Sequence, residues 1–438
     1  MLNQLLFKRI DNSSLIVFRI IFGLLCFLES VGAIFTGWVK RTLVDPKFTF
    51  NFIGFDFLQP LPGNGIYFYY VLMGIFGLGI MLGYKYRFSI IAFTVMWSAT
   101  YFMQKASYNN HYYLLILLSG LMALMPAHKA VSIDAKQNPS IQENAMPAWC
   151  KWFFVLQLFI VYTYASVAKL YPDWLDFTVP KLFMTSKGSY PVIGELLQNE
   201  FMPYLVAYGG ILYDGLIIPM LFFKRTRKIA FAGSIFFHLF NSVVFQVGIF
   251  PYLALAFSLF FFEAEKINRI FLKRKPLYTG NEIKVMNYKP ILVGLASVYF
   301  VIQIALPLRQ HFIQDNVLWT EEGHRLSWRM MLRSKAGSTT FRVKNHTTGK
   351  NYNVNLKDYL SKKQARMAQT KPDVMWQFSQ RLKRLHKEKG EDISVYITSY
   401  LSVNGRPYKA FTNPKIDVAN QDWNYFGHTD WLLPSYLY

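Results

Sequence analysis

Long apolar runs dominate the chain between residues 14 and 308. Nine of these runs stand out: 14–36, 66–84, 88–104, 111–126, 149–170, 203–223, 229–246, 249–262 and 290–308. Several reach the roughly 20 residues that an α-helix needs to cross a bilayer, and none alternates like a membrane β-strand. The pattern therefore predicts a multi-pass α-helical membrane bundle with about nine spans. The run at 249–262 is short enough to be a re-entrant or tilted segment.

Basic residues gather in every second connection between these runs, as the positive-inside rule requires of cytoplasmic loops. They precede the first run, separate the second from the third, follow the fourth, separate the sixth from the seventh and follow the eighth. The order predicts a cytoplasmic N-terminus, and nine spans then place the C-terminus on the opposite side. The first run does not read as a cleavable signal peptide, because it is too long and contains Arg19 and Glu29.

The composition changes after residue 308. Residues 309–438 hold 21 Lys and Arg against 11 Asp and Glu, which gives a net charge of +10. Short β-like runs at 340–345 and 393–401 flank a basic helical stretch at about 357–389. We therefore predict a transmembrane domain at 1–308 and a smaller extramembrane α+β or β-rich domain at 309–438. The basic helix is either a solvated face or a docking surface for an acidic partner or anionic headgroups.

The overall composition supports this division. The chain is 53% hydrophobic and 16% charged, yet its formal net charge is +22. Loop clusters that orient the spans and the basic C-terminal part account for this charge, so no nucleic-acid partner is needed. The two cysteines, Cys26 and Cys150, lie inside apolar runs and form no zinc or disulfide pattern. The scattered histidines show no metal-ligand spacing, and no phosphate loop or nucleophile elbow is present, so we expect no metal.

Lys169 is the most informative ionisable residue inside the apolar runs. It closes the span WFFVLQLFIVYTYASVAKLYPDWL at 152–175, near the predicted non-cytoplasmic face. Charged groups at membrane depth are costly and usually mark function. A lysine at a span end can simply extend its ammonium group to the interface. Alternatively it turns into the bundle, where desolvation favours the neutral amine and makes it a possible general base.

Histidines and asparagines form the second group of candidates. Asn109, Asn110 and His111 stand at the head of the fourth run, where Asn110 either caps the helix or takes part in chemistry. His238 lies in the middle of the seventh run, and Asn241 follows at i+3 on the same face, so these two side chains are expected to form a buried polar patch.

Several blocks of the sequence together resemble vitamin K-dependent γ-glutamyl carboxylase and its shorter microbial homologues. The resemblance runs from about residue 13 to residue 434, and its blocks occur in the same order: SLIVFRIIFG at 14–23, GIMLGYKYRFS at 79–89, NNH at 109–111, FIVYTYASVAKLYPDW at 159–174, HLFNSVVFQVGIFPY at 238–252, LPLRQHF at 306–312 and WTEEGHRLSWRMMLRSK at 319–335. The animal enzymes are longer beyond the point where this chain stops and have an extended N-terminal leader. We therefore do not carry over their recognition of a propeptide.

The resemblance implies a reaction, its cofactors and its partners. Reduced vitamin K, of phylloquinol or menaquinol type, enters from the lipid bilayer and reacts with O₂. The oxygenated product removes a γ-proton from a peptide glutamate, the carbanion captures CO₂, and the cofactor leaves as its 2,3-epoxide. A glutamate-containing peptide or protein is therefore the implied substrate, and a separate quinone reductase recycles the epoxide. The implied location is a bacterial inner membrane with a periplasmic C-terminal domain, or the endoplasmic reticulum membrane with a lumenal one.

The matching motifs also assign residues. They imply that Lys169 is the catalytic base, that His111 assists vitamin K binding or epoxidation, and that Asn110 orients the oxygenated intermediate. The animal motif has a second lysine directly before the base, where this chain has Ala168. Four further residues in the matching blocks are assigned to cofactor binding: Asn109, His238, Asn241 and His311.

The basic extramembrane domain then gains a role. It holds the acidic substrate, with Arg325, Arg329 and Arg333 as candidates. Two other functions compete with carboxylation: an epoxidase for vitamin K hydroquinone that lacks carboxylase activity, and a non-enzymatic quinone-binding membrane protein.

Overall fold

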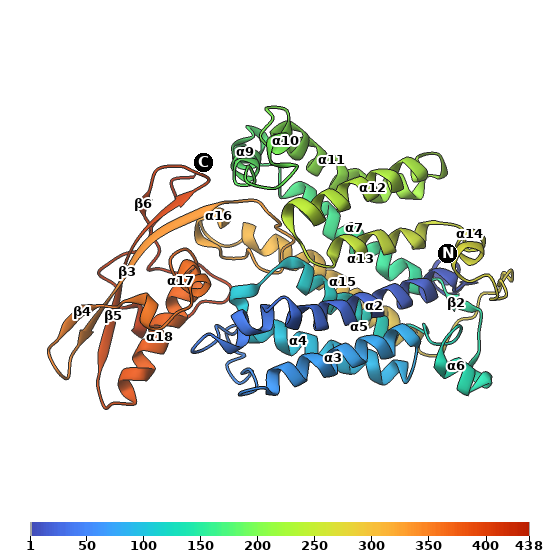
Figure 1. The fold of residues 1–438 in the computed structure, drawn as a ribbon, viewed down its shortest axis with the longest axis horizontal. Coiled ribbons are helices and arrows are strands. Elements are labelled where there is room, and N and C mark those ends of the chain that lie inside the picture. Colours follow the sequence, from blue (N-terminus) through green and yellow to red (C-terminus); the bar gives the residue numbers. More distant parts are fainter. Residues whose placement is uncertain (1, 438) are drawn as a thin grey trace. The chain divides into compact units, whose positions relative to one another are not determined.

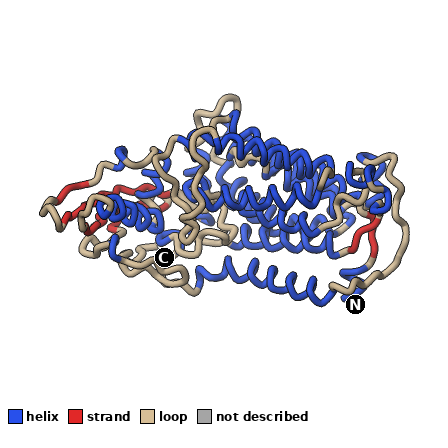
Figure 2. The backbone as a smooth tube through the Cα atoms, turned by 90° about the horizontal axis from the view of Figure 1, so that it is seen from below, coloured by secondary structure: helices blue, strands red, loops and turns tan. Residues whose placement is uncertain are grey.

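The computed structural model describes residues 2–437, and its contacts divide the chain into two units. The helical unit contains the chain up to Val44 together with Asn51–Thr163 and Leu212–Gln303. The sheet unit contains Asp45–Phe50, Tyr164–Ile211 and the chain from Ile304 onward. Helices make up most of the first unit, whereas the longest strands belong to the second (Figures 1 and 2).

Every one of the nine predicted apolar runs forms helix. The six helices that are long and apolar enough to cross a membrane, among the described residues, are α2 (Ser13–Phe35), α3 (Gly65–Leu82), α7 (Trp149–Val167), α11 (Met202–Phe222), α12 (Lys224–Phe245) and α15 (Lys289–Leu308). The remaining runs form α4 (Tyr86–Met103), α5 (Asn110–Leu124) and α13 (Phe250–Phe257).

The predicted count of nine spans is therefore not confirmed. The helix α4 begins next to Arg87 and carries several hydroxyl side chains, so its apolar character is weaker. The helix α5 has 15 residues, and α13 has 8 before it tightens into a 3₁₀ turn at Ser258–Phe261. A run of apolar residues indicates that a segment avoids water, but it does not show at which residue the helix within that run ends.

Close packing of α2 on α3 organises the core of the helical unit (Figure 1). Two glycines make this approach possible. A Cβ atom on Gly23 would lie 2.2 Å from the backbone nitrogen of Met81, and one on Gly77 would lie 2.6 Å from that of Phe27. Small residues at such crossings let helix backbones come together without a side chain between them.

Short elements tie down one end of the helical unit. After α1 (Leu2–Phe7), strand β1 (Arg9–Asp11) pairs antiparallel with β2 (Ala145–Pro147). Arg9 forms an ion pair with Glu143, and Lys275 forms one with Asp11 in which both side chains are buried. The remaining short helices of this unit are α6 (Ile133–Gln137) and α14 (Ala264–Phe271).

The sheet unit is built on a long antiparallel ladder. Strands β3 (Lys335–Asn345) and β5 (Ile393–Val403) pair over their whole length, with Phe341 opposite Ile397. The edge strands β4 (Asn351–Asn353) and β6 (Lys409–Ala410) complete the order β4-β3-β5-β6 among the described residues. The two β-like runs of the sequence are thus confirmed as strands, and β3 begins earlier than predicted.

The predicted basic helix is in fact two helices, α17 (Lys362–Ala368) and α18 (Pro372–Lys387). A capping box at Ser361 starts α17, and Pro372 stands in the first turn of α18, where a missing N–H is tolerated. The apolar side of α18, with Val374, Phe378 and Leu382, packs into the core that covers β3 and β5. Short helices elsewhere in this unit are α8 (Pro172–Leu175), α9 (Thr178–Thr185), α10 (Gly194–Leu197) and α16 (Val317–Thr320).

Candidate functional site

His238 lies inside the helical unit in a ring of hydroxyl groups. Its side chain on α12 is 1% exposed. The Nε2 atom lies 2.9 Å from the hydroxyl of Tyr213 and 3.2 Å from that of Tyr162. The Nδ1 atom is buried and has no hydrogen-bond partner among residues 2–437. One ring nitrogen is thus held by tyrosines and the other is available to a bound group.

Phe250 contacts two of the three predicted histidines, His111 and His238. Its ring stacks on the imidazole of His111 with centroids 4.2 Å apart, and it meets His238 edge-on at 5.9 Å. His111 lies in the first turn of α5 and Phe250 begins α13, so two helix starts and the middle of α12 converge here. Phe250 lies in the block HLFNSVVFQVGIFPY, but nothing in its own type distinguished it from the 40 phenylalanines of the chain.

The two asparagines before His111 make different contacts at the start of α5. Asn109, not Asn110, caps α5, because its side-chain oxygen accepts a hydrogen bond from the backbone N–H of Tyr112 at 2.7 Å. Asn110 is buried, and its side-chain oxygen accepts from the Tyr108 hydroxyl at 2.7 Å. The expectation that Asn110 caps the helix is therefore wrong.

The expected polar patch of His238 and Asn241 does not form in the described chain. Asn241 is half-buried, and the hydrogen bonds of His238 go to tyrosines instead. Spacing at i+3 places two side chains on one face of a helix, but residues on neighbouring helices decide what they bond to.

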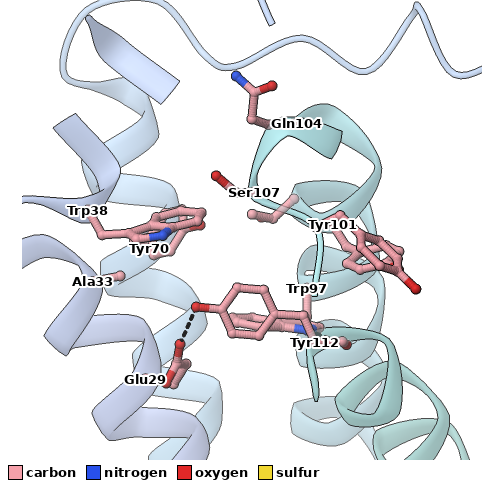
Figure 3. A pocket seen from close by; sticks show the side chains of 11 residues that line it. Glu29, Ala33, Trp38, Tyr70, Trp97, Tyr101, Gln104, Ser107 and Tyr112 are labelled. Atoms are coloured by element: carbon pink, nitrogen blue, oxygen red, sulfur yellow. Dashed lines mark hydrogen bonds between the residues drawn. The ribbon is translucent and has the colours of Figure 1, made fainter. Parts of the chain in front are cut away.

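A small cavity of the helical unit contains an acidic group (Figure 3). Glu29 on α2 points into it, and its Oε1 atom accepts a hydrogen bond from the Tyr112 hydroxyl at 2.8 Å. Tyr70, Trp38 and Trp97 add aromatic walls. In the sequence, Glu29 stands out only as a charge inside the first apolar run, and Tyr112 has no distinguishing feature.

Lys169 lies in the sheet unit, just beyond the end of α7. Its side chain is folded inward, since the residue is 8% exposed. The Nζ atom donates to the carbonyl of Ala165 at 2.9 Å and lies 5.7 Å from the centre of the Trp174 ring. A Cβ atom on Gly210 would approach the Lys169 Cε atom to 3.4 Å. The amine is therefore surrounded by protein rather than extended into solvent.

Two of the three candidate arginines in the block at 319–335 form ion pairs with carboxylates. Arg325 forms an ion pair with Asp373, and the Arg333 Nε atom donates to Glu321 at 2.6 Å. Arg329 is buried, and burial lowers the pKa of its guanidinium to about 10. His311, the remaining predicted cofactor residue, is exposed and lies beside Gln310.

Glu321 is the centre of a cluster of three ion pairs in the sheet unit. Besides Arg333, its carboxylate contacts the Nζ atom of Lys335 at 3.1 Å and that of Lys371 at 2.7 Å. Burial by itself raises the pKa of Glu321, but these three cations together hold it well below its usual value. Burial, offset in part by Glu321, lowers the pKa of Lys335 to about 8.

Two family models match the chain. The first is described as "HTTM domain" and matches residues 7–265, which is more than half of the sequence. The second is described as "Vitamin K-dependent gamma-carboxylase, lumenal domain" and matches residues 288–437. The chain belongs to the vitamin K-dependent gamma-carboxylase family. No solved structure matches this member of the carboxylase family.

Family membership confirms the resemblance found in the sequence. Together with the apolar helices, it identifies this carboxylase-family chain as an integral membrane protein. The predicted base Lys169 and the histidines His111 and His238 lie within the first matched region, and the three arginines lie within the second. Among residues 2–437, no group of three or more His, Cys, Asp or Glu side chains is placed to hold a metal ion.

Proposed function

We propose that this protein is a membrane-embedded vitamin K-dependent gamma-glutamyl carboxylase. It converts glutamate in a peptide to γ-carboxyglutamate with CO₂ and O₂, coupled to oxidation of vitamin K hydroquinone to the 2,3-epoxide. The observation that carries the proposal is the match to the carboxylase-specific lumenal domain over residues 288–437, in one chain with the match over 7–265.

The aromatic cluster of the helical unit fits a flat hydroquinone. Phe250 and the half-buried imidazole of His111 offer ring faces, and the unpartnered Nδ1 atom of His238 can hydrogen-bond to a phenolic hydroxyl. When bound, the hydroquinone together with O₂ supplies the basicity that removal of a glutamate γ-proton requires. Tyr162 and Tyr213 keep the His238 ring in one orientation through its other nitrogen.

Lys169 has the surroundings expected of the proton acceptor. The carbonyl of Ala165 orients its Nζ atom, and its low exposure limits competition from water. In the proposed reaction the Nζ atom of Lys169 accepts a phenolic proton. The tryptophan ring of Trp174, at 5.7 Å, then faces the ammonium group that results, which is a favourable cation–π arrangement.

The arginines of the second matched region are proposed to serve the acidic peptide, and the domain that carries them is proposed to be periplasmic or lumenal. Charge reversal at Arg325, Arg329 or Arg333 should weaken use of the peptide more than formation of the epoxide. Equal losses of both products would contradict this separation of roles.

The deciding experiment supplies membranes that contain the protein with reduced vitamin K, O₂, ¹⁴C-labelled CO₂ and a glutamate-containing peptide. Label in the peptide together with epoxide supports the carboxylase. Epoxide alone supports an epoxidase without carboxylation. If neither product forms, the result supports a non-enzymatic quinone-binding protein.

A pair of matched variants locates the chemistry. Lys169→Ala should abolish both products, because it removes the proposed proton acceptor. Lys151→Ala is the control: Lys151 lies on α7 with its Nζ atom 5.6 Å from the Trp152 ring, a cation–π arrangement like that of Lys169. The control variant should keep both products, and loss of activity in both variants would remove the special role of Lys169.

A further inference from the structure

The side chain of Glu29 lies beside hydrogen-bond donors from two segments of the chain. Its Oε1 atom accepts from the Tyr112 hydroxyl at 2.8 Å, and the backbone N–H of Ile249 donates to the same group. Gly248, directly before Ile249, has a left-handed φ of +64°, which other residues rarely adopt, and a Cβ there would lie in ordinary contact with Glu29 Oε2 at 3.5 Å. One carboxylate thus accepts hydrogen bonds from two segments that are far apart in the sequence.

Each of these two donors is next in sequence to a ring of the aromatic cluster. Tyr112 follows His111, and Ile249 precedes Phe250. Those two rings stack with centroids 4.2 Å apart. Glu29 therefore joins the first turn of α5 to the first turn of α13, at the point where the proposed cofactor-binding rings meet.

The cavity beside Glu29 is too small to be the hydroquinone site itself. The centre of a water molecule can occupy about 20 Å³ of this cavity. That space holds one water molecule, but it does not hold a bicyclic ring system. The Glu29 carboxylate faces this cavity (Figure 3). The group is consequently placed to hold other residues, not to contact the cofactor.

We propose that Glu29 is a positioning residue that fixes the His111–Phe250 pair for the cofactor. The inference rests on the proposed function and names a residue that acts through two others. The acceptor oxygens of Glu29 matter because the group accepts from both the tyrosine hydroxyl and the backbone N–H. A glutamine at this position keeps one acceptor but presents an NH₂ group to one of the two donors.

The test compares Glu29→Gln, Tyr112→Phe and the double variant with Tyr69→Phe as control. Tyr69 donates to the carbonyl of Met96 at 2.6 Å, so the control also removes one tyrosine hydrogen bond from the bundle but none from Glu29. Epoxide formation by the full chain is measured against the concentration of reduced vitamin K and, separately, of peptide. Thermal unfolding of each purified variant reports folding.

Glu29→Gln and Tyr112→Phe should each raise KM for reduced vitamin K about tenfold, the effect of losing one hydrogen bond to a charged group. The KM for peptide should stay unchanged, and the double variant should be no worse than Glu29→Gln alone. Should Glu29→Gln fail to fold, Tyr112→Phe carries the test. A wild-type KM in these variants, or an equal rise in Tyr69→Phe, overturns the inference.

Failure of the proposed function would look different. If the unaltered protein forms no epoxide, the enzymatic proposal is lost for all variants alike. Binding of oxidised vitamin K, followed by quenching of tryptophan fluorescence, then makes the same comparison without turnover. Weaker binding in Glu29→Gln and Tyr112→Phe, but not in Tyr69→Phe, supports positioning by Glu29, whereas equal binding in all four proteins overturns it.

Discussion

Replacing Glu321 by glutamine should open the sheet unit locally. The side chain of Glu321 is 6% exposed, and Arg333, Lys335 and Lys371 all contact its carboxylate. Glutamine keeps the shape of the side chain but removes the negative charge. Three cations then remain together in the interior without the anion that balances part of their charge.

The count of charges sets the expected magnitude. Removing one partner of a buried ion pair typically costs about 3–5 kcal/mol, because the other partner is left uncompensated. We take the lower value, about 3 kcal/mol, since Arg333 and Lys371 retain some contact with water. Removing Lys371 instead leaves the carboxylate with two cations and relieves repulsion, so Lys371→Met should change stability by less than about 1 kcal/mol.

Hydrogen exchange of the β3–β5 ladder measures this difference in the full-length protein. A loss of about 3 kcal/mol in opening free energy speeds exchange of the ladder amides by roughly two orders of magnitude. The ladder amides should respond to Glu321→Gln and hardly to Lys371→Met, while amides of α2 and α3 stay unchanged. Equal effects of the two substitutions would refute the argument from charge balance.

The dependence on pH follows from the same group. The pKa of Glu321 is lowered in the folded protein, so its contribution is present above the usual value of 4.5 and is lost as the pH falls toward the lower folded value. In Glu321→Gln this loss on acidification should disappear.

Three further outcomes are expected. Because burial lowers the pKa of Lys335 from 10.5 to about 8, the unfolded chain binds more protons between these two pH values, and stability should rise by up to about 3 kcal/mol from pH 8 to 10.5. Burial also lowers the pKa of the neighbouring Lys371, so Lys335→Met should reduce the rise rather than abolish it, and chemical unfolding at each pH measures the difference. Gly23→Ala should lower the yield of folded protein, because the added Cβ collides with the backbone of Met81. Gly32→Ala is the control, since a Cβ there meets open space, and the yield of detergent-extracted protein compares the two variants. Lys169→Arg should form no epoxide, since arginine stays protonated and cannot accept the phenolic proton. Chromatography of the reaction products measures the epoxide.

The sequence predicted the helices well because burial in a bilayer leaves a strong pattern. It predicted span lengths poorly, as α13 shows: the apolar run continues to residue 262, but the α-helix ends at Phe257. In the sheet unit, alternation revealed only part of β3, since the first half of the strand, from Lys335 to Thr339, has a polar sequence with little contrast between its two faces.

The site was predictable where a residue type is unusual for its surroundings. Lys169 and the histidines stand out among apolar residues, because charged or polar groups are rare at that depth. Their partners do not stand out, since Tyr213 and Phe250 are aromatic residues in a chain that is 18% aromatic. Glu29 and Tyr112 are 83 positions apart, so only the fold reveals their hydrogen bond.

The structure also separates two ways in which positive charge can act on an acidic peptide. Three cations of the sheet unit lie around Glu321 in the interior, whereas Arg342 and Lys344 project from exposed positions of β3. Exposed charges attract a ligand over distances comparable to the Debye length, about 10 Å at 0.1 M salt, and this attraction weakens as salt is added. Buried pairs are screened much less. A KM for peptide that rises with salt would therefore point to the exposed face, and one that is indifferent to salt would point to the buried arginines.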